Sequence, residues 1–387
     1  MNYFFTEEQQ MIIDMTRRIT EDHVVPARAK MDEEEIFPHE ILDKLAEAGL
    51  CGLYIPEEYG GFGGKVLEFV LAVEEISKAC IGTSVSFAAN ALGSYPILAF
   101  GTEEQKQKYM PDIAAGKNLA AFGLTEANAG SDAAGVQTTA VKDGDHYILN
   151  GTKQWITNGG EAETYTVIAM TDKSKGPRGA SAFILEKGIK GFTFGKKEDK
   201  MGIRASATTE LIFQDVKVPK ENLIGREGMG FIIAMKNLDH SRPGIAAQGV
   251  GLATGALDAA IKYSRERVQF GKPIAGQQVI QHMLAEMATK IEAARALLYA
   301  GSRFIDSGAK DISKISAMTK LFATDLAMEV TTDALQIFGG YGYMKEYPME
   351  KMMRDAKILQ IYEGTNQIQR NVIGLQLIKE NAAKHSK

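Results

Sequence analysis

The stretch Glu210–Val218, ELIFQDVKV, decides the fold, because it is the last β-rich run of the chain and helical periodicity replaces it a few residues later. Three similar runs precede it, HYILN, TYTVIAM and ASAFILE. The turn pairs Asp143-Gly144 and Asn150-Gly151 mark the two ends of the first run. These features predict an antiparallel β domain over residues 119–225.

Helical patterns flank this β domain on both sides. Before it, Thr6-x-x-Gln9 and Thr102-x-x-Gln105 have the form of capping boxes, in which side chains satisfy the free amides at a helix start. After Asn222, apolar residues recur at helical spacing along two long stripes, as in an antiparallel bundle. We therefore predict an α+β fold with an N-terminal α-helical domain (1–118), the middle β domain (119–225) and a C-terminal four-helix bundle (226–387).

The composition excludes several classes of protein. The chain has 387 residues, of which 45% are hydrophobic and 24% are charged, as is typical of an ordinary globular protein with two or three domains. Its formal net charge of -5 gives no electrostatic footprint for nucleic acid, so we expect no nucleic-acid partner. No segment approaches the roughly 18 unbroken apolar residues that a membrane span needs. Six histidines without an HxxxH pair predict no metal site.

The N-terminal segment and the cysteines bear on the compartment. The first residues, MNYFFTEEQQM, have neither the apolar core of a signal peptide nor the Arg-rich composition of a transit peptide, so we expect a cytoplasmic protein. Cys51 and Cys80 lie in apolar surroundings without a CxxC pattern, and we expect them to be buried thiols.

Two motifs imitate functional signatures. The glycines of Gly249-x-Gly251-x-x-x-Gly255 look like a dinucleotide fingerprint, but they lie inside a helical segment and do not follow a strand, which favours close helix packing. The triplet Asp239-His240-Ser241 contains the residue types of a hydrolase triad. Consecutive helical residues point about 100° apart, so these three cannot form hydrogen bonds in series.

The segment QIYEGTNQIQR, residues 360–370, contains the best candidate for chemistry. Glu363 lies between an aromatic residue and Gly364, directly before a helix-capping Thr365 or Asn366. A desolvated carboxylate gains basicity, and the free amides of the helix start could face an anion such as a pyrophosphate. Local sequence leaves a second interpretation open, in which Glu363 is a solvated loop residue.

This segment resembles the C-terminal signature of the acyl-CoA dehydrogenase family, and five other segments resemble further motifs of that family in matching order. They are FGLTEANAGSD (122–132), QWITNG (154–159), LDHSRPGIAAQ (238–248), RVQFGKPI (267–274) and QIFGGYGY (336–343). The resemblance covers nearly the whole chain, and it implies the helix, sheet, helix order predicted above.

The resemblance implies an FAD enzyme that converts a saturated acyl-CoA to the trans-2-enoyl thioester. Glu363 would remove the α-proton while N5 of FAD accepts a hydride from the β-carbon, and the amide of the base and a flavin hydroxyl would polarise the substrate carbonyl. The residues that match cofactor positions are Phe122, Leu124, Thr125, Ser131, Trp155, Ile156, Thr157, Arg267, Gln269, Phe270, Gln278, Gln336, Gly339, Gly340, Thr365, Asn366 and Gln367. The residues that match substrate positions are Ser131, Asp239, His240, Ser241, Arg242, Tyr362 and Gly364.

The resemblance also implies partners. Arg267 and the residues that follow it match positions that hold the dinucleotide across a subunit boundary, so a homotetramer is expected. Arg242 is expected near the nucleotide end of CoA, and electron-transferring flavoprotein is expected to take the electrons. Two positions depart from the family pattern. Ser241 stands where one branch carries its base, which favours Glu363, and Ala127 replaces a proline.

Several alternatives remain open at this level. A short- or medium-chain acyl-CoA is the leading substrate, and the small residues of FAANALGSYPI (87–97) are expected to shape the floor of the acyl pocket. The alternatives are a dehydrogenase for a cyclic or branched acyl-CoA, an enoyl-CoA reductase in an electron-bifurcating complex, and an oxidase that uses oxygen. A flavin- or nucleic-acid-binding relative without catalysis belongs to another class.

Overall fold

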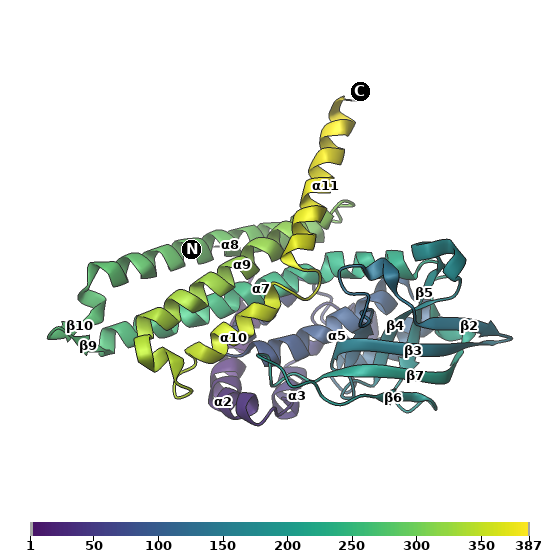
Figure 1. Cartoon of the computed structure of the whole chain (residues 1–387), viewed down its shortest axis with the longest axis horizontal. Coiled ribbons are helices and arrows are strands. Elements are labelled where there is room, and N and C mark those ends of the chain that lie inside the picture. Colours follow the sequence, from purple (N-terminus) through teal and green to yellow (C-terminus); the bar gives the residue numbers. More distant parts are fainter. Residues whose placement is uncertain (1–2, 386–387) are drawn as a thin grey trace.

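The computed structural model describes residues 3–385, with helices at both ends of the chain and a single large sheet between them (Figure 1). The two predicted capping boxes are present, because the hydroxyls of Thr6 and Thr102 accept hydrogen bonds from the amides of Gln9 and Gln105. The N-terminal helices are α1 (Glu7–Ile19), α2 (Val25–Glu33), α3 (His39–Glu47), α4 (Val66–Ser77), α5 (Ile81–Phe100) and α6 (Glu103–Ala114).

The sheet runs in the order β6-β7-β3-β2-β4-β5-β8, and β1 pairs with β4 beside this path. Its strands are β1 (Ala120–Gly123), β2 (Thr139–Asp143), β3 (His146–Thr157), β4 (Thr164–Met170), β5 (Ala180–Glu186), β6 (Phe192–Phe194), β7 (Thr208–Pro219) and β8 (Leu223–Ile224). Most pairs are antiparallel as predicted, but β4 is parallel to both β1 and β2. Parallel strands need a long connection, and the β2–β3 hairpin between β1 and β4 supplies it.

The sheet divides its apolar residues between two cores. Residues of β4 and β5 such as Ile168 and Ile184 pack with α5, α6 and the start of the long helix α7 (Gly230–Glu266). In the second core, Leu149 of β3 and Phe213 of β7 cluster with Phe183 of β5. The first core therefore joins the sheet to the helices, and the active site described below lies along that junction.

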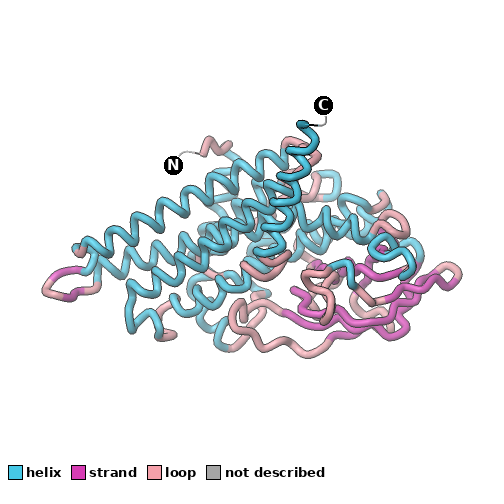
Figure 2. Tube along the Cα trace, turned by 45° about the horizontal axis from the view of Figure 1, so that its top comes forward, coloured by secondary structure: helices cyan, strands magenta, loops and turns pink. Residues whose placement is uncertain are grey.

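The C-terminal helices form the long bundle seen in Figures 1 and 2. They are α7 (Gly230–Glu266), α8 (Gln278–Asp306), α9 (Ser313–Phe338), α10 (Met349–Leu359) and α11 (Asn366–His385), with a hairpin of β9 (Val268–Gln269) and β10 (Lys272–Pro273) between α7 and α8. Three long helices, α7, α8 and α9, lie side by side, whereas α11 projects away from the body. The predicted order of helices, sheet and helices is confirmed.

Helix α7 is the central element of the bundle. Its length and apolar composition are those of a membrane-crossing helix. However, 72% of its 18-residue apolar stretch is buried inside the protein, as in a core helix of a globular protein. A Cβ atom at Gly249 would lie 2.7 Å from the Ala323 carbonyl of α9, and one at Gly251 would lie 2.3 Å from the Glu74 carbonyl of α4. The glycine spacing therefore serves close helix packing, as predicted from the sequence.

This packing predicts the effect of a single methyl group. Gly251→Ala should destabilise the protein by about 1–3 kcal/mol, because the added Cβ overlaps the backbone of α4 and the helices must separate. Gly374→Ala in α11 is the matched control, since it is also helical and has no atom within 4 Å of the added Cβ. The control should be neutral or stabilising by roughly 0.5–1 kcal/mol. Thermal and urea denaturation measure both variants, and equal midpoints would contradict the packing argument.

Candidate active site

The loop between α10 and α11 holds Glu363 in an uncommon backbone conformation. Glu363 has φ of 51° and Gly364 has φ of 90°, so two successive residues lie in the left-handed region. For glutamate this conformation costs roughly 1–2 kcal/mol. The Glu363 carbonyl accepts hydrogen bonds from Arg242 Nε at 3.4 Å and from Gln369 Nε2 at 3.2 Å. These contacts from α7 and α11 hold the strained turn in place.

The carboxylate of Glu363 is partly buried and has a specific donor. Ser241 Oγ of α7 donates a hydrogen bond to Glu363 Oε2. Burial raises the pKa of Glu363 above its usual value, while the Ser241 hydrogen bond and the positive charges of Arg242 and Lys320 act in the opposite direction. The result is a carboxylate of increased basicity in a site of restricted solvent access, which are the properties of a general base.

Glu363 lines two cavities that meet at its side chain. The first, of about 270 Å³, is largely apolar and lies between α4, α5, α7 and the C-terminal end of α8. Its walls include Tyr54, Val66, Phe69, Ala88, Ala91, Tyr95, Leu98, His240, Gly244 and Ile245. Three of these come from the 87–97 segment that was predicted to shape an acyl pocket.

The second cavity, of about 220 Å³, lies between the sheet, α5, α7 and the Glu363 loop. A bulge in the pairing of β3 with β7 falls between Lys153 and Ile156, and Trp155 has φ of 57°. Bulges commonly re-aim side chains beside active sites. Here the bulge leaves Trp155 56% exposed on the cavity wall. An exposed indole next to the hydroxyls of Thr125, Ser131 and Thr157 suits a flat ligand with polar edges.

A buried ion pair supports this wall from behind. Lys153 Nζ donates to Glu126 Oε1 at 2.8 Å and to the Leu124 carbonyl at 3.0 Å, and its side chain is fully buried. The amides of Gln137 and Thr138 donate to the same glutamate. The pair therefore fixes the segment that carries Leu124 and Thr125 onto β3.

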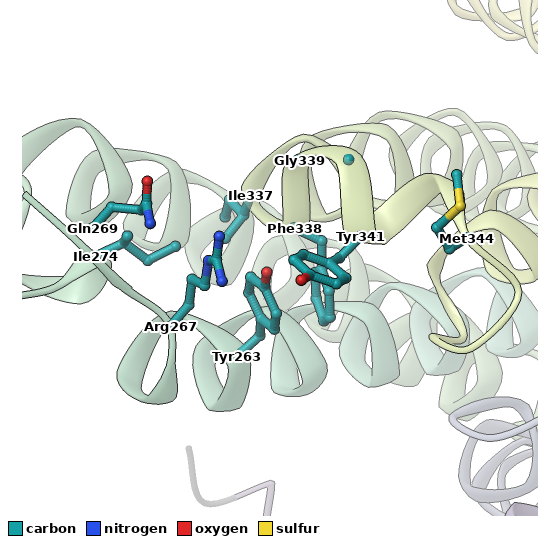
Figure 3. Close-up of a pocket in the computed structure, with 10 residues that line it drawn as sticks. Tyr263, Arg267, Gln269, Ile274, Ile337, Phe338, Gly339, Tyr341 and Met344 are labelled. Atoms are coloured by element: carbon teal, nitrogen blue, oxygen red, sulfur yellow. The ribbon is translucent and has the colours of Figure 1, made fainter.

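A third hollow, of about 500 Å³, lies at the end of the bundle beside the β9–β10 hairpin (Figure 3). Arg267 lies over the ring of Tyr341, 5.1 Å from its centroid, and Tyr263 stacks on Phe338 at 4.1 Å. Of the predicted cofactor residues, Arg267, Gln269, Gly339 and Gly340 line this hollow. It lies at the end of the molecule opposite the sheet (Figure 1).

The structure thus brings the predicted residues together in two separate groups. One group lines the cavities at Glu363 and comprises Phe122, Leu124, Thr125, Ser131, Trp155, Ile156, Thr157, His240, Ser241, Arg242, Tyr362 and Gly364. The other lines the hollow at Arg267. Seven predicted residues line none of these three spaces, namely Asp239, Phe270, Gln278, Gln336, Thr365, Asn366 and Gln367.

Two of these side chains are engaged by partners within the protein. Arg242 is 4% exposed, pairs with Asp239 at 2.7 Å and donates to the Glu363 carbonyl, while its expected place at the nucleotide end of CoA stays a prediction. Asn366 is buried, and its amide is engaged by Thr324 and Asp325 of α9. In both cases a buried polar partner determines the position, and the local sequence does not show that partner.

The triplet at residues 239–241 behaves as the helical geometry requires. Asp239 binds Arg242, the ring of His240 stacks on Tyr95 at 4.5 Å, and Ser241 donates to Glu363. The three side chains therefore have separate partners, and no hydrolase triad is formed.

Sequence reasoning missed three residues at the site: Lys153, Lys320 and Gln369. All three are polar side chains with a relative exposure of 0%. Lys320, for example, lies three residues from both Ala317 and Ala323 on the inner face of α9. A charged residue within an apolar stripe was the available signal, because such a residue is buried only with specific partners.

Three domain models of one family match the chain. They are described as the N-terminal, middle and C-terminal domains of acyl-CoA dehydrogenase, and they match residues 6–117, 121–216 and 228–378. A Clostridium acetobutylicum protein named "Acyl-CoA dehydrogenase, short-chain specific" is 50% identical over 380 residues, which are 98% of this chain and 100% of that protein.

Solved structures agree with these matches. The butyryl-CoA dehydrogenase of Megasphaera elsdenii superposes with a TM-score of 0.95 at 50% identity, covering 98% of this chain and 100% of that one. A chain in a structure of the electron transferring flavoprotein of Acidaminococcus fermentans, concerned with flavin-based electron bifurcation, has a TM-score of 0.95 at 57% identity. That comparison covers 97% of this chain and 99% of the other.

The buried pair behind the Trp155 wall gives a test of the site's architecture. Lys153→Met should destabilise the protein by about 3 kcal/mol, because it leaves the Glu126 carboxylate buried without its counter-charge. Lys220→Met is the matched control, since Lys220 pairs with Asp145 at the exposed surface. Urea denaturation compares the two variants. A control that loses as much stability as Lys153→Met would exclude a special role for the buried pair.

Proposed function

Because the chain belongs to the acyl-CoA dehydrogenase family, we propose that it converts a short-chain acyl-CoA such as butyryl-CoA to the trans-2-enoyl-CoA. It is an oxidoreductase that acts on a CH–CH bond. The observation that carries the substrate proposal is the position of Glu363, at the junction of an apolar cavity and a cavity with an exposed indole. A base at this junction can remove a proton from a carbon held between the two spaces.

FAD is the cofactor of this family. The residues present fit it, because the cavity of about 220 Å³ combines the exposed face of Trp155 with the hydroxyls of Thr125 and Thr157. When bound, FAD supplies the acceptor for the hydride that leaves the β-carbon. Trp155, Ile156 and Thr157 would hold its ring system from the side of the sheet.

Glu363 performs the proton transfer in this proposal. Its carboxylate takes the α-proton, and Ser241 keeps one carboxylate oxygen in a fixed position until the substrate arrives. Among the described residues, no hydrogen bond engages the backbone amide of Glu363. That amide is available to stabilise negative charge on the thioester oxygen as the proton leaves.

The apolar cavity supports a short acyl chain. Phe69 and Phe87 stack at 5.8 Å, and Tyr54 meets the edge of Phe69, so large aromatic side chains close part of the space. Ala88 and Ala91 leave room nearest α5. The short-chain name of the Clostridium relative points to the same class of substrate.

The two groups of cofactor residues support an oligomer, for which we propose a homotetramer. Arg267 follows the end of α7, whereas Arg242 lies on the same helix about 37 Å earlier at roughly 1.5 Å per residue. A single FAD bound at the Glu363 cavity would not extend to the Arg267 hollow of the same chain. A second copy placing its Arg267 hollow against the first would complete the site.

Electron-transferring flavoprotein is the proposed electron acceptor, and the cytoplasm is the proposed location. The Acidaminococcus structure concerns such a flavoprotein and a chain of the same fold, which supports this partner. The same structure supports a second candidate function, in which the chain works as an enoyl-CoA reductase within an electron-bifurcating assembly. Both functions use the same base and differ in the direction of electron flow.

Glu363→Gln tests the proposed reaction. The variant should retain FAD and bind acyl-CoA but lose at least about 1,000-fold in flavin reduction, because an amide cannot accept the α-proton. Anaerobic mixing with butyryl-, octanoyl-, isobutyryl- and cyclohexanecarbonyl-CoA, followed by loss of the flavin absorbance, measures reaction and substrate together. Asp306→Asn, at the far end of the apolar cavity, is the control for loss of a carboxylate elsewhere. Rapid bleaching by Glu363→Gln would remove Glu363 from the mechanism.

The pH dependence follows from the environment of Glu363. Its carboxylate acts as a base only when ionised, so flavin reduction should fall as the pH drops through its pKa, which burial raises. Ser241→Ala removes a donor that lowers this pKa. The acid limb of the pH profile, which is the pH range over which the rate of flavin reduction falls, should therefore move to higher pH by about one unit. Ser241→Thr keeps a hydroxyl and should retain the original limb. An acid limb that is identical in all three proteins would exclude Ser241 from this role.

A further inference from the structure

A lysine with no counter-ion lies beneath the Glu363 turn. Lys320, in the middle of α9, has a relative exposure of 0%. Its ammonium donates to the Gly364 carbonyl at 2.9 Å and to Asn366 Oδ1 at 2.8 Å. Both acceptors flank Glu363, one in the strained turn and one at the first residue of α11. Lys320 therefore binds the two ends of the segment that presents the base.

Both partners of Lys320 are neutral oxygens. In the part of the chain that the structure describes, it forms no salt bridge with a carboxylate, unlike the buried Lys153 and Lys351. Burying an ammonium costs several kcal/mol unless opposite charge compensates it. A glutamine amide could donate to the same kind of oxygen without that cost. The hydrogen bonds alone therefore do not explain why a cation occupies this position.

The nearby charges indicate what the cation does. Burial lowers the pKa of Lys320 to about 7, and Glu363 is the strongest influence in the opposite direction. The effect is mutual, since Lys320 is among the charges that favour the ionised form of Glu363. The charge of each group therefore supports the charge of the other across the turn.

We propose that Lys320 is a positioning residue for the dehydrogenation, which holds the left-handed turn through the Gly364 carbonyl and supplies the positive charge that keeps Glu363 an ionised base. This inference rests on the proposed function, because it assumes that Glu363 removes the α-proton. It extends that function by assigning a task to a residue that touches neither of the two cavities at Glu363.

Other charged groups also surround Glu363, and none of them replaces Lys320. Among residues 3–385, Arg242 is the other cation that acts on the carboxylate, and its charge is already paired with Asp239. Asp325 of α9 is anionic and is bonded to Arg370. The remaining titratable groups that line the two cavities or the turn are Tyr54, Lys65, Tyr95, His240, Asp306 and Tyr362.

Two substitutions separate the charge from the hydrogen bonds. Lys320→Gln keeps a donor of similar reach but removes the charge, whereas Lys320→Arg keeps the charge. Thr324→Val is the matched structural control, because Thr324 bonds the same Asn366 side chain without carrying a charge. For each FAD-loaded protein, flavin reduction by butyryl-CoA is measured across the pH range, together with the dissociation constant of the acyl-CoA.

The expected result is a shift of the acid limb without loss of substrate binding. Lys320→Gln should move the acid limb of the pH profile to higher pH by about one unit. At a pH below this limb, the rate of flavin reduction should therefore fall roughly tenfold relative to the wild-type protein. The dissociation constant should change less than threefold, and Lys320→Arg and Thr324→Val should keep the original limb. A uniform loss of rate at every pH with an unmoved limb would show a merely structural role and overturn the proposal. Failure of the wild-type protein to reduce its flavin would instead contradict the proposed function.

A stability measurement tests the same coupling without turnover. At pH 6, below the pKa of about 7 of Lys320, Lys320→Gln should lower the melting temperature more in the wild-type background than in Glu363→Gln, since the second background lacks the carboxylate charge. If Lys320→Gln does not accumulate as a folded protein, the double variant should be recovered in larger amount. Equal losses in both backgrounds, or a double variant no better folded than the single one, would overturn the proposal.

Discussion

The left-handed turn at Glu363 and Gly364 is the constraint on which the active site depends. A glutamate resists this conformation, so the turn persists only because groups from three helices hold its carbonyls. Arg242 comes from α7, Lys320 from α9 and Gln369 from α11. Two of these groups, Arg242 and Lys320, also place positive charge next to the carboxylate. Position and basicity of the base therefore have a common origin in the packing of the bundle.

Helix α7 makes this arrangement possible. Its glycines let the backbones of α4 and α9 approach closely, and this approach brings Lys320 beneath the turn while Ser241 and Arg242 face it from the other side. The apolar cavity lies where the α4 and α5 side of α7 meets the turn, and the Trp155 cavity lies where the sheet meets it. The close helix packing is thus a condition for the chemistry as well as for stability.

The chemistry divides between the two sides of the turn. The sheet presents the bulge at Trp155, backed by the buried Lys153–Glu126 pair, and forms a wall for a planar cofactor. The helices present an apolar space and the base. In the proposed reaction, Glu363 would take a proton from a substrate carbon between the two walls, and FAD held by the Trp155 wall would supply the hydride acceptor. In the proposed homotetramer, the Arg267 hollow of a second chain would complete the cofactor site.

The sequence by itself determined the type and order of the elements, the two capping boxes and the helical role of the α7 glycines, and it supplied Glu363 as the candidate base. Each of these is encoded by spacing within one segment or by a motif whose residues are adjacent in the chain. Only the tertiary structure decided that β1 runs parallel to β4, that Arg242 is buried beside Glu363, and that Lys320 is a buried cation below it. Ser241 and Glu363 are 122 positions apart, and Lys320 and Gly364 are 44 apart. Contacts of this kind arise from how helices pack against one another, and no local pattern in the chain specifies which side chains will then share one buried space.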